Sequence, residues 1–277
     1  RSSAGGNFAM PVVATCHSCL ATWWEAVKGT QALPEDFVWR VRLAARGMAQ
    51  AEALMAPTAA FAQATARAYG LARPPMVVRN GRARHGRDVA LAGMPGETFA
   101  FTAGRLWDEG KNVAAIDRAA ARLDIPVLAA GPIAGPNGAR VALRHARPLG
   151  RLTEGEIGYW LGRQPIFVSM ARYEPFGLAV LEAAQAGCPL VLADIPTFVE
   201  LWGGAAEFVD PHDDAALAAA LDRIAADPAH RARLAEAARE RSRQYTPDAM
   251  AQGVLDVYRA LLAGERSRPS RRLEAHA

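Results

Sequence analysis

The sequence predicts an α/β protein built on doubly wound parallel sheets. Short apolar runs alternate with longer helical stretches along most of the chain, and this β-α-β order is typical of a parallel sheet, which binds ligands beyond the carboxyl ends of its strands. The chain has 277 residues, of which 51% are hydrophobic, so it can bury the core of one large or two small domains. Residues 80–97 are rich in Gly and Arg without sustained periodicity, which predicts a linker between two domains.

The segment before the linker is expected to contain three strands and two helices. Its short apolar runs predict strands, and its longer stretches predict helices, the second of which is opened by Pro57 and Thr58. The expected elements are strands at 11–15, 53–56 and 76–79 and helices at 35–50 and 57–69.

After the linker the alternation resumes. Thr153 and Glu156 have the spacing of a capping box, Gly187 ends a helix, and Pro247 follows Thr246 at the first position of a final helix. The expected strands are 99–103, 126–130, 140–143, 146–148, 166–169, 189–192 and 207–210. The expected helices are 111–123, 153–162, 178–186, a short one from 195, Ala-rich helices within 213–244, and 247–263.

The most informative stretch is E-P-F-G-L-A-V-L-E-A-A-Q-A-G-C-P at 174–189. Seven residues separate Glu174 from Glu182, and two helical turns cover about seven residues, so Glu182 can share a face with the turn just after Glu174. A ligand at this helix N-terminus would then meet both carboxylates and the backbone N–H groups of the first turn. The alternative is that Glu182 is a solvated residue on an outer helix face. Residues 178–186 are otherwise almost wholly apolar or small, which favours burial, and a buried carboxylate needs partners.

These residues resemble the E-x7-E signature of retaining glycosyltransferases, and the whole stretch is similar to glycosyltransferase family 4, which has the GT-B fold. F-T-A-G-R-L-W-D-E-G-K-N at 101–112, V-V-R-N-G at 77–81 and P-V-V-A-T-C-H-S at 11–18 resemble further segments of that family, in the expected order. The resemblance implies two Rossmann-like doubly wound domains with a cleft between them. It also implies that the N-terminal domain lacks its first strands and their Gly-rich loop.

The resemblance divides the chain into four parts. Residues 1–84 are expected to be a partial, acceptor-side N-terminal domain, and 85–245 the domain that binds the nucleotide-sugar donor. Residues 246–263 are expected to form a helix crossing back toward the N-terminal domain. The Arg-rich tail, 264–277, is expected to be disordered and solvated, with weak contact to acidic lipids as the alternative.

The reaction implied by the resemblance moves a sugar from a nucleotide diphosphate to an acceptor hydroxyl and keeps the anomeric configuration. The departing diphosphate gains negative charge, so fixed cations aimed at it stabilise the transition state. Arg105, after a predicted strand, and Lys111, expected in the first turn of the next helix, have that role by resemblance; otherwise they are solvated surface cations. Protein cations can replace a divalent metal, so neither a metal nor another cofactor is expected.

The remaining donor-site residues come from the E-x7-E stretch. Phe176, Gly177 and Leu178 are expected to donate backbone N–H groups to phosphate or sugar oxygens, helped by the helix dipole. By resemblance, Glu182 holds the ribose hydroxyls. Glu174 contacts the donor sugar and stabilises positive charge at its ring, with a covalent nucleophile role as the alternative.

The segment C-H-S-C at 16–19 supports two interpretations. By resemblance, His17 touches the donor sugar near the acceptor, although a lone histidine is more often structural. A strand, C-x-x-C and a helix in succession also match the thioredoxin-like redox arrangement, and the simpler alternative is that Cys16 and Cys19 are incidental small residues. A zinc site is disfavoured because Cys188 stands alone and no second pair supplies the other ligands.

Composition limits the partners. The net charge of +4 suits an anionic substrate or a membrane surface, and it is too diffuse to indicate nucleic acid. Three cysteines give no disulfide framework, and no apolar run approaches 20 residues, so we expect a cytoplasmic protein that can contact the inner membrane face.

The expected partners are a nucleotide-sugar donor and a glycan, lipid-linked or small-molecule acceptor. Two alternative functions remain: a nucleotide-sugar binding module without transfer activity, because the chain is truncated, and a GT-B hydrolase or epimerase.

Overall fold

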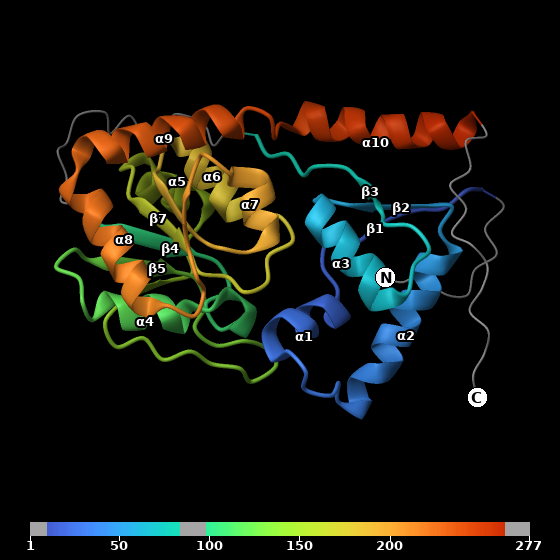
Figure 1. Ribbon diagram of the computed structural model, residues 1–277, viewed down its shortest axis with the longest axis horizontal. Coiled ribbons are helices and arrows are strands. Elements are labelled where there is room, and N and C mark those ends of the chain that lie inside the picture. The colour runs from blue at the N-terminus through green and yellow to red at the C-terminus, as the bar shows by residue number, and fades with distance from the viewer. Residues whose placement is uncertain (1–9, 84–97, 264–277) are drawn as a thin grey trace. The chain divides into compact units, whose positions relative to one another are not determined.

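The computed structural model describes residues 10–83 and 98–263, and its contacts divide them into two units (Figure 1). One unit comprises residues 10–81 together with 247–263, and the other lies between 82 and 246. The unit boundaries fall beside the expected domain boundaries at 84/85 and 245/246, whose acceptor and donor assignments stay predictions. Part of the expected linker, 84–97, and the expected disordered tail, 264–277, lie outside the described residues.

The first unit is built on a three-stranded parallel sheet of order β1-β2-β3. Thr58 caps its third helix by accepting a hydrogen bond from the Phe61 N–H, and Gly70 ends that helix in the left-handed conformation. The last helix belongs to this unit because Val257 is buried against Ala53 and Met55 of the sheet. The strands are β1 (Val13–Thr15), β2 (Ala53–Ala56) and β3 (Met76–Val77), and the helices are α1 (Leu20–Lys28), α2 (Glu35–Gln50), α3 (Ala59–Tyr69) and α10 (Pro247–Leu262).

The second unit is a doubly wound domain around a six-stranded, all-parallel sheet of order β6-β5-β4-β7-β8-β9. Its strands are β4 (Ala100–Ala103), β5 (Val127–Ala130), β6 (Arg147–Gly150), β7 (Ile166–Ser169), β8 (Leu190–Ala193) and β9 (Glu207–Val209). Its helices are the 3-10 turn η1 (Glu109–Lys111), α4 (Val113–Ala120), α5 (Glu154–Gly162), α6 (Leu178–Ala186), α7 (Pro196–Trp202), α8 (Asp214–Ala226) and α9 (Pro228–Ser242).

The strands of this sheet are apolar on both faces because helices cover both. Side chains alternate along a strand, so Phe101 and Phe167 enter one core with Trp202, while Ala100 and Val168 enter the other. In Figure 1, α5, α6, α7 and α9 lie on one side of the sheet, and α4 and α8 on the other.

The strand order places a ligand-binding crevice at one point of the sheet. β4 pairs with β5 on one side and with β7 on the other, so the first strand of this unit lies in its middle. The chain winds outward from β4 toward β6 first, and then from β7 toward β9. In such sheets the crevice opens at the carboxyl ends of the two strands where the winding reverses, here β4 and β7.

Two sequence-based expectations need correction. The helix expected at 111–123 is split, because Asn112 adopts a left-handed conformation (φ 52°) between η1 and α4. The strand expected at 140–143 is wrong: within the described ranges this stretch forms only an isolated bridge, between Ala134 and Arg140. Its apolar side chains, Val141 and Leu143, pack on a small core instead, so the hydrophobic pattern reflected packing of a loop.

Two helix-start predictions are confirmed. Thr153 accepts a hydrogen bond from the Glu156 N–H while the Glu156 carboxylate accepts from the Thr153 N–H, which is the expected capping box. Pro247 begins α10 as expected. Within 10–83 and 98–263, no helix is both long and apolar enough to cross a membrane.

Candidate active site

The carboxyl end of β4 leads into a tight turn that places Arg105 at the crevice. Gly104 has φ 150°, and its N–H donates to the carbonyl of Ala130 at the end of neighbouring β5. Gly131 follows Ala130 with φ 137°, and a Cβ atom there would lie 1.8 Å from the Gly104 carbonyl oxygen. Only glycine therefore fits at position 131 while the β4 turn keeps this path.

Arg105 is held by its own loop but remains accessible. Its guanidinium donates to Oδ2 of Asp108 at 3.0 Å and lies 5.8 Å from the centre of the Trp107 ring. The side chain is 63% exposed, so the ion pair orients the cation without removing it from solvent.

Lys111 lies at the end of the 3-10 turn η1, and Asp108 and Asn112 fix that turn at either side. Oδ1 of Asp108 accepts the Gly110 N–H at 3.0 Å, and the Asn112 amide donates to the Pro211 carbonyl at 2.8 Å. The Gly110 carbonyl in turn accepts the N–H groups of Arg172 and Tyr173, which follow β7. The turn that bears Lys111 is thus bound to the segment that bears Glu174.

Glu174 lies in the turn that opens α6 and forms an ion pair with Lys111. Its other carboxylate oxygen accepts the Phe176 N–H at 3.4 Å. The Lys111 and Glu174 side chains are 26% and 16% exposed, so the pair is partly withdrawn from water. Gly177 then caps the N-terminus of α6 with φ 90°, and a Cβ atom there would lie 3.1 Å from the Phe198 ring, so glycine permits both the turn and its packing.

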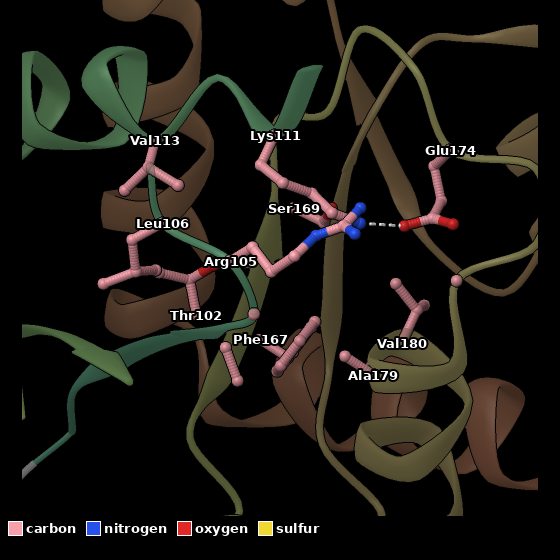
Figure 2. Close-up of a pocket in the computed structure, with 13 residues that line it drawn as sticks. Thr102, Arg105, Leu106, Lys111, Val113, Phe167, Ser169, Glu174, Ala179 and Val180 are labelled. Atoms are coloured by element: carbon pink, nitrogen blue, oxygen red, sulfur yellow. Dashed lines mark hydrogen bonds and ion pairs between the residues drawn. The ribbon is translucent and has the colours of Figure 1, made fainter. Parts of the chain in front are cut away.

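These residues line one small cavity at the predicted crevice. Figure 2 shows the charged groups of Arg105, Lys111 and Glu174 pointing toward one another, with Ser169 of β7 beside them. The enclosed volume is about 20 Å³, room for about one water molecule, so a larger ligand must extend beyond it. The lining residues are Thr102, Ala103, Gly104, Arg105, Leu106, Lys111, Val113, Phe167, Ser169, Glu174, Gly177, Ala179 and Val180.

The structure brings four of the predicted site residues together and places the others elsewhere. Arg105, Lys111, Glu174 and Gly177 line the cavity, whereas Phe176, Leu178 and Glu182 are not part of its lining. The Phe176 ring is buried against Tyr245, and Leu178 is 39% exposed at the start of α6. His17 belongs to the first unit, and its place beside the donor site stays a prediction.

Glu182 is held by a residue that the sequence did not indicate. Nε of Arg82 lies 2.6 Å from Oε1 of Glu182, and the same guanidinium reaches Glu154 at 3.0 Å. The Arg82 carbonyl accepts the Gln185 amide at 2.8 Å. The Glu182 side chain is only 13% exposed, so it is not a solvated residue of an outer helix face. In the sequence, Arg82 stood out only as a basic residue near the start of the Gly/Arg-rich segment, and nothing there paired it with Glu182.

A second buried carboxylate supports the loop before β6. Asp117 of α4 accepts the backbone N–H groups of Arg144, His145 and Ala146 at 2.8–3.1 Å. Burial by itself would raise the Asp117 pKa, but these three donors outweigh it and lower that pKa. In the described part of the chain, no group of three or more His, Cys, Asp or Glu residues is placed to hold a metal ion.

Solved structures identify the fold. Sucrose-phosphate synthase from Thermosynechococcus elongatus superposes with a TM-score of 0.78 and 22% identity, covering 93% of this chain and 69% of that one. HepE from Anabaena, solved in complex with UDP-glucose, gives a TM-score of 0.70 and 20% identity, covering 90% of this chain and 72% of that one. At these identities the likeness establishes the fold, and the predicted GT-B fold is confirmed.

Sequence relatives narrow the class further. Residues 141–241 match the family model for glycosyl transferases group 1. The glycogen synthase of Mycobacterium tuberculosis (strain ATCC 25618 / H37Rv) is 40% identical over 127 residues, which are 45% of this chain and 31% of that protein. The D-inositol 3-phosphate glycosyltransferase of Nocardioides sp. (strain ATCC BAA-499 / JS614) is 32% identical over 127 residues, 45% of this chain and 27% of that protein. The matched segments thus span less than a third of these relatives, and together the matches support a GT-B glycosyltransferase.

Proposed function

We propose that this protein is a retaining, family 4 glycosyltransferase that moves a sugar from a nucleotide-diphosphate sugar to an acceptor hydroxyl. The observation that supports this most directly is the convergence of Arg105, Lys111 and Glu174 at the reversal point of the second sheet, next to the N-terminus of α6. Two cations and a helix N-terminus form an anion site, and the carboxylate beside them can face a positively charged sugar ring.

The charge distribution suits departure of a diphosphate. Arg105 is oriented by Asp108 and exposed to solvent, so a diphosphate oxygen can reach its guanidinium as negative charge develops. The Lys111 ammonium is balanced by Glu174 in this structure and would gain a second anionic partner when the diphosphate binds. Because both cations are fixed before binding, little reorganisation is needed in the transition state.

The other site residues have complementary roles in this proposal. Phe176, Gly177 and Leu178 would direct backbone N–H groups at phosphate or sugar oxygens, and Glu182 would accept ribose hydroxyls. Glu174 would stabilise positive charge at the sugar ring rather than form a covalent intermediate. His17 would touch the donor sugar near the acceptor.

The wider setting also belongs to this proposal. A nucleotide-sugar donor is supported by the UDP-glucose complex of HepE, and a glycan or small-molecule acceptor by the names of the relatives, glycogen synthase and D-inositol 3-phosphate glycosyltransferase. A lipid-linked acceptor is the third alternative in this proposal. We propose that the reaction serves glycan, glycolipid or polysaccharide synthesis and needs no divalent metal or other cofactor. The three cysteines are present as thiols, which suits a cytoplasmic location, with peripheral contact at the inner membrane face as a further proposal.

The first experiment is a thermal-shift panel with UDP, GDP, ADP and their glucose and mannose conjugates. A ligand at 100 times its dissociation constant stabilises the protein by about 2.7 kcal/mol, which moves the melting temperature by several degrees. We expect a shift with one base that disappears in Lys111→Gln and in Glu182→Ala. Lys28→Gln, in the other unit, is the matched control and should keep the full shift.

Product analysis then tests the reaction. With the donor that binds, we expect a transferred sugar whose anomeric configuration by NMR equals that of the donor. Binding without any product would indicate a binding module, and free sugar or an epimer formed without acceptor would indicate a hydrolase or epimerase. An inverted product would contradict the retaining mechanism, and no shift with any nucleotide from a cooperatively melting protein would contradict the donor site itself.

A further inference from the structure

The segment between β1 and α1 lines a second cavity, which shares no lining residue with the donor cavity. β1 ends at Thr15, and Cys19 is the residue just before the first turn of α1. Both Cys16 and Cys19 line a cavity of about 360 Å³ that lies wholly within the first unit. The Cys16 side chain is buried and that of Cys19 is half-buried, so the cavity gives small molecules a path to both sulfur atoms.

The two thiols interact directly and differ in acidity. A hydrogen bond between the Cys16 and Cys19 thiols is the main cause that lowers the pKa of Cys19 to about 6, and the same contact, with burial, raises the pKa of Cys16. Sγ of Cys19 also lies 2.9 Å from the Thr22 hydroxyl. The N-terminus of α1 adds a positive partial charge beside Cys19, which further favours a thiolate there.

Further polar side chains line the cavity. Tyr69 is 8% exposed, and its hydroxyl interacts with Cys19 and helps to lower the pKa of that thiol. Burial raises the pKa of Tyr69, which keeps the hydroxyl a donor at neutral pH. Arg40, from α2, is the remaining titratable side chain on this lining besides Tyr69 and the two thiols, and it adds a positive charge.

We propose that Cys16 and Cys19 are a redox-active dithiol pair that exchanges with small acidic disulfides entering this cavity. The pair, the cavity, the Tyr69 hydroxyl and the Arg40 cation lie within one unit, so the proposal does not depend on glycosyl transfer at the other site. Cys188 serves as the contrast: it is a single thiol, fully buried, and burial raises its pKa.

The exchange proceeds in two balanced steps. The Cys19 thiolate attacks one sulfur of a small disulfide RSSR, forming a Cys19–S–S–R bond and releasing RS⁻, which takes up a proton. Cys16 then loses its proton to solvent and attacks Sγ of Cys19, forming the Cys16–Cys19 disulfide and releasing a second RS⁻. The protein loses two electrons and two protons, and the small disulfide becomes two thiols. Cys16 is the resolving residue because its raised pKa holds it protonated until the mixed disulfide has formed.

The direct test treats the full chain with oxidised glutathione, quenches with acid, and maps the peptide that contains Cys16 and Cys19 by mass spectrometry. We expect an internal disulfide, with a mass lower by two hydrogen atoms, and no glutathione adduct on folded protein at Cys188. Cys16→Ser should instead accumulate the mixed disulfide on Cys19, and Cys19→Ser should form neither product. In the unsubstituted protein, an unmodified peptide, or disulfides that form only between two chains, would overturn the proposal.

The pH dependence of alkylation gives an independent readout. A thiol with pKa 6 is about half thiolate at pH 6, whereas a thiol with pKa 8.5 is almost wholly protonated at that pH. The thiolate of lower pKa is also the weaker nucleophile, so at pH 6 the first thiol should react with iodoacetamide about tenfold faster than the second. We therefore expect a Cys19 midpoint near pH 6. A midpoint near 8.5 would show an ordinary cysteine and end the proposal.

The selectivity for acidic reagents is tested with Arg40. Replacing one exposed charge, in Arg40→Gln, should slow exchange with oxidised glutathione by up to about fivefold and accelerate exchange with the cationic disulfide cystamine by a similar factor. Arg42→Gln, on the same helix but absent from the cavity lining, is the matched control and should change neither rate. Equal slowing of both reagents by Arg40→Gln would contradict selection by charge.

Discussion

Replacing Glu174 tests whether the Lys111–Glu174 pair belongs to a donor site, because stability, diphosphate affinity and turnover should then change in different directions. In Glu174→Gln the side chain keeps its size but loses its charge, so the Lys111 ammonium loses its counter-ion. If this pair belongs to a donor site, the protein should become less stable, bind a diphosphate more tightly and transfer sugar more slowly. A purely structural ion pair would show only the first of these effects.

The stability loss follows from burial. Opposite unit charges 4 Å apart attract by about 4 kcal/mol at an effective dielectric constant of 20, and desolvation and side-chain ordering offset much of that. Because the two side chains are 26% and 16% exposed, the pair lies between a surface bridge and a buried one. We expect Glu174→Gln to lower the free energy of unfolding by about 1–2 kcal/mol, which corresponds to a fall in melting temperature of about 3–6 °C.

The affinity gain has the same electrostatic origin. A carboxylate roughly 8 Å from a diphosphate, at an effective dielectric constant of about 40, repels each unit of its charge by about 1 kcal/mol. Because a diphosphate carries at least two negative charges, removing the carboxylate should lower the dissociation constant of the nucleoside diphosphate by about 30-fold, as measured by calorimetry at low salt. Turnover should fall by about 100-fold, because charge at the sugar ring loses its stabilising partner.

The matched control is Glu240→Gln, which removes the same charge from an ion pair with Arg243 whose side chains are 62% and 60% exposed. It should change stability by less than about 0.5 kcal/mol and leave diphosphate affinity and turnover unaltered. The reasoning is refuted if Glu174→Gln weakens diphosphate binding, or if it leaves turnover intact while lowering stability.

Three further predictions concern the supports of the site. A double-mutant cycle of Arg82→Gln and Glu182→Gln, followed by urea denaturation, should give a coupling energy of about 1–2 kcal/mol; a value near zero would mean that the pair is merely adjacent. Gly131→Ala should lower the melting temperature by at least about 6 °C, because its Cβ would overlap a backbone carbonyl, whereas Gly138→Ala, also at positive φ but in open space, should cost about 1 kcal/mol. Asp117→Asn should lower the free energy of unfolding by about 2 kcal/mol at pH 7. Because the pKa of Asp117 is depressed in the folded protein, the stability difference between wild type and variant should shrink as the pH falls below about 4 toward that pKa. A stability difference from urea denaturation that does not change with pH would contradict the role given to Asp117.

Local signals predicted much of the second unit and parts of the first. The strands at 53–56 and 166–169 and the helix at 35–50 have the predicted bounds, because each is a clear apolar or helical run with a proline at one end. The order of β and α elements was sufficient to predict a doubly wound sheet, since parallel neighbours need crossover helices. The sheet order itself depends on which strands pair, and that information is not local.

The sequence-based predictions were wrong where the structure of a segment depends on one residue's backbone conformation or on a partner far away in the sequence. Asn112 interrupts a run that otherwise resembles one helix, because its amide binds the carbonyl of Pro211 from the other half of the sheet. The stretch at 140–143 has strand-like residues, but Asp117 takes up the backbone N–H groups that follow it. The partner of Glu182, 100 positions earlier at Arg82, could not be inferred from either segment alone.

In the structure, the E-x7-E spacing does more than place two glutamates on one face of a helix. α6 begins at Leu178, so Glu174 lies in the turn before the helix while Glu182 lies on its second turn. The seven intervening residues therefore give each carboxylate its own cation, Lys111 for Glu174 and Arg82 for Glu182. A donor that places a diphosphate near one carboxylate and a ribose near the other would perturb the two pairs independently. The effects of Glu174→Gln and Arg82→Gln on nucleotide affinity should then be additive, whereas a single continuous charge network would make them strongly coupled.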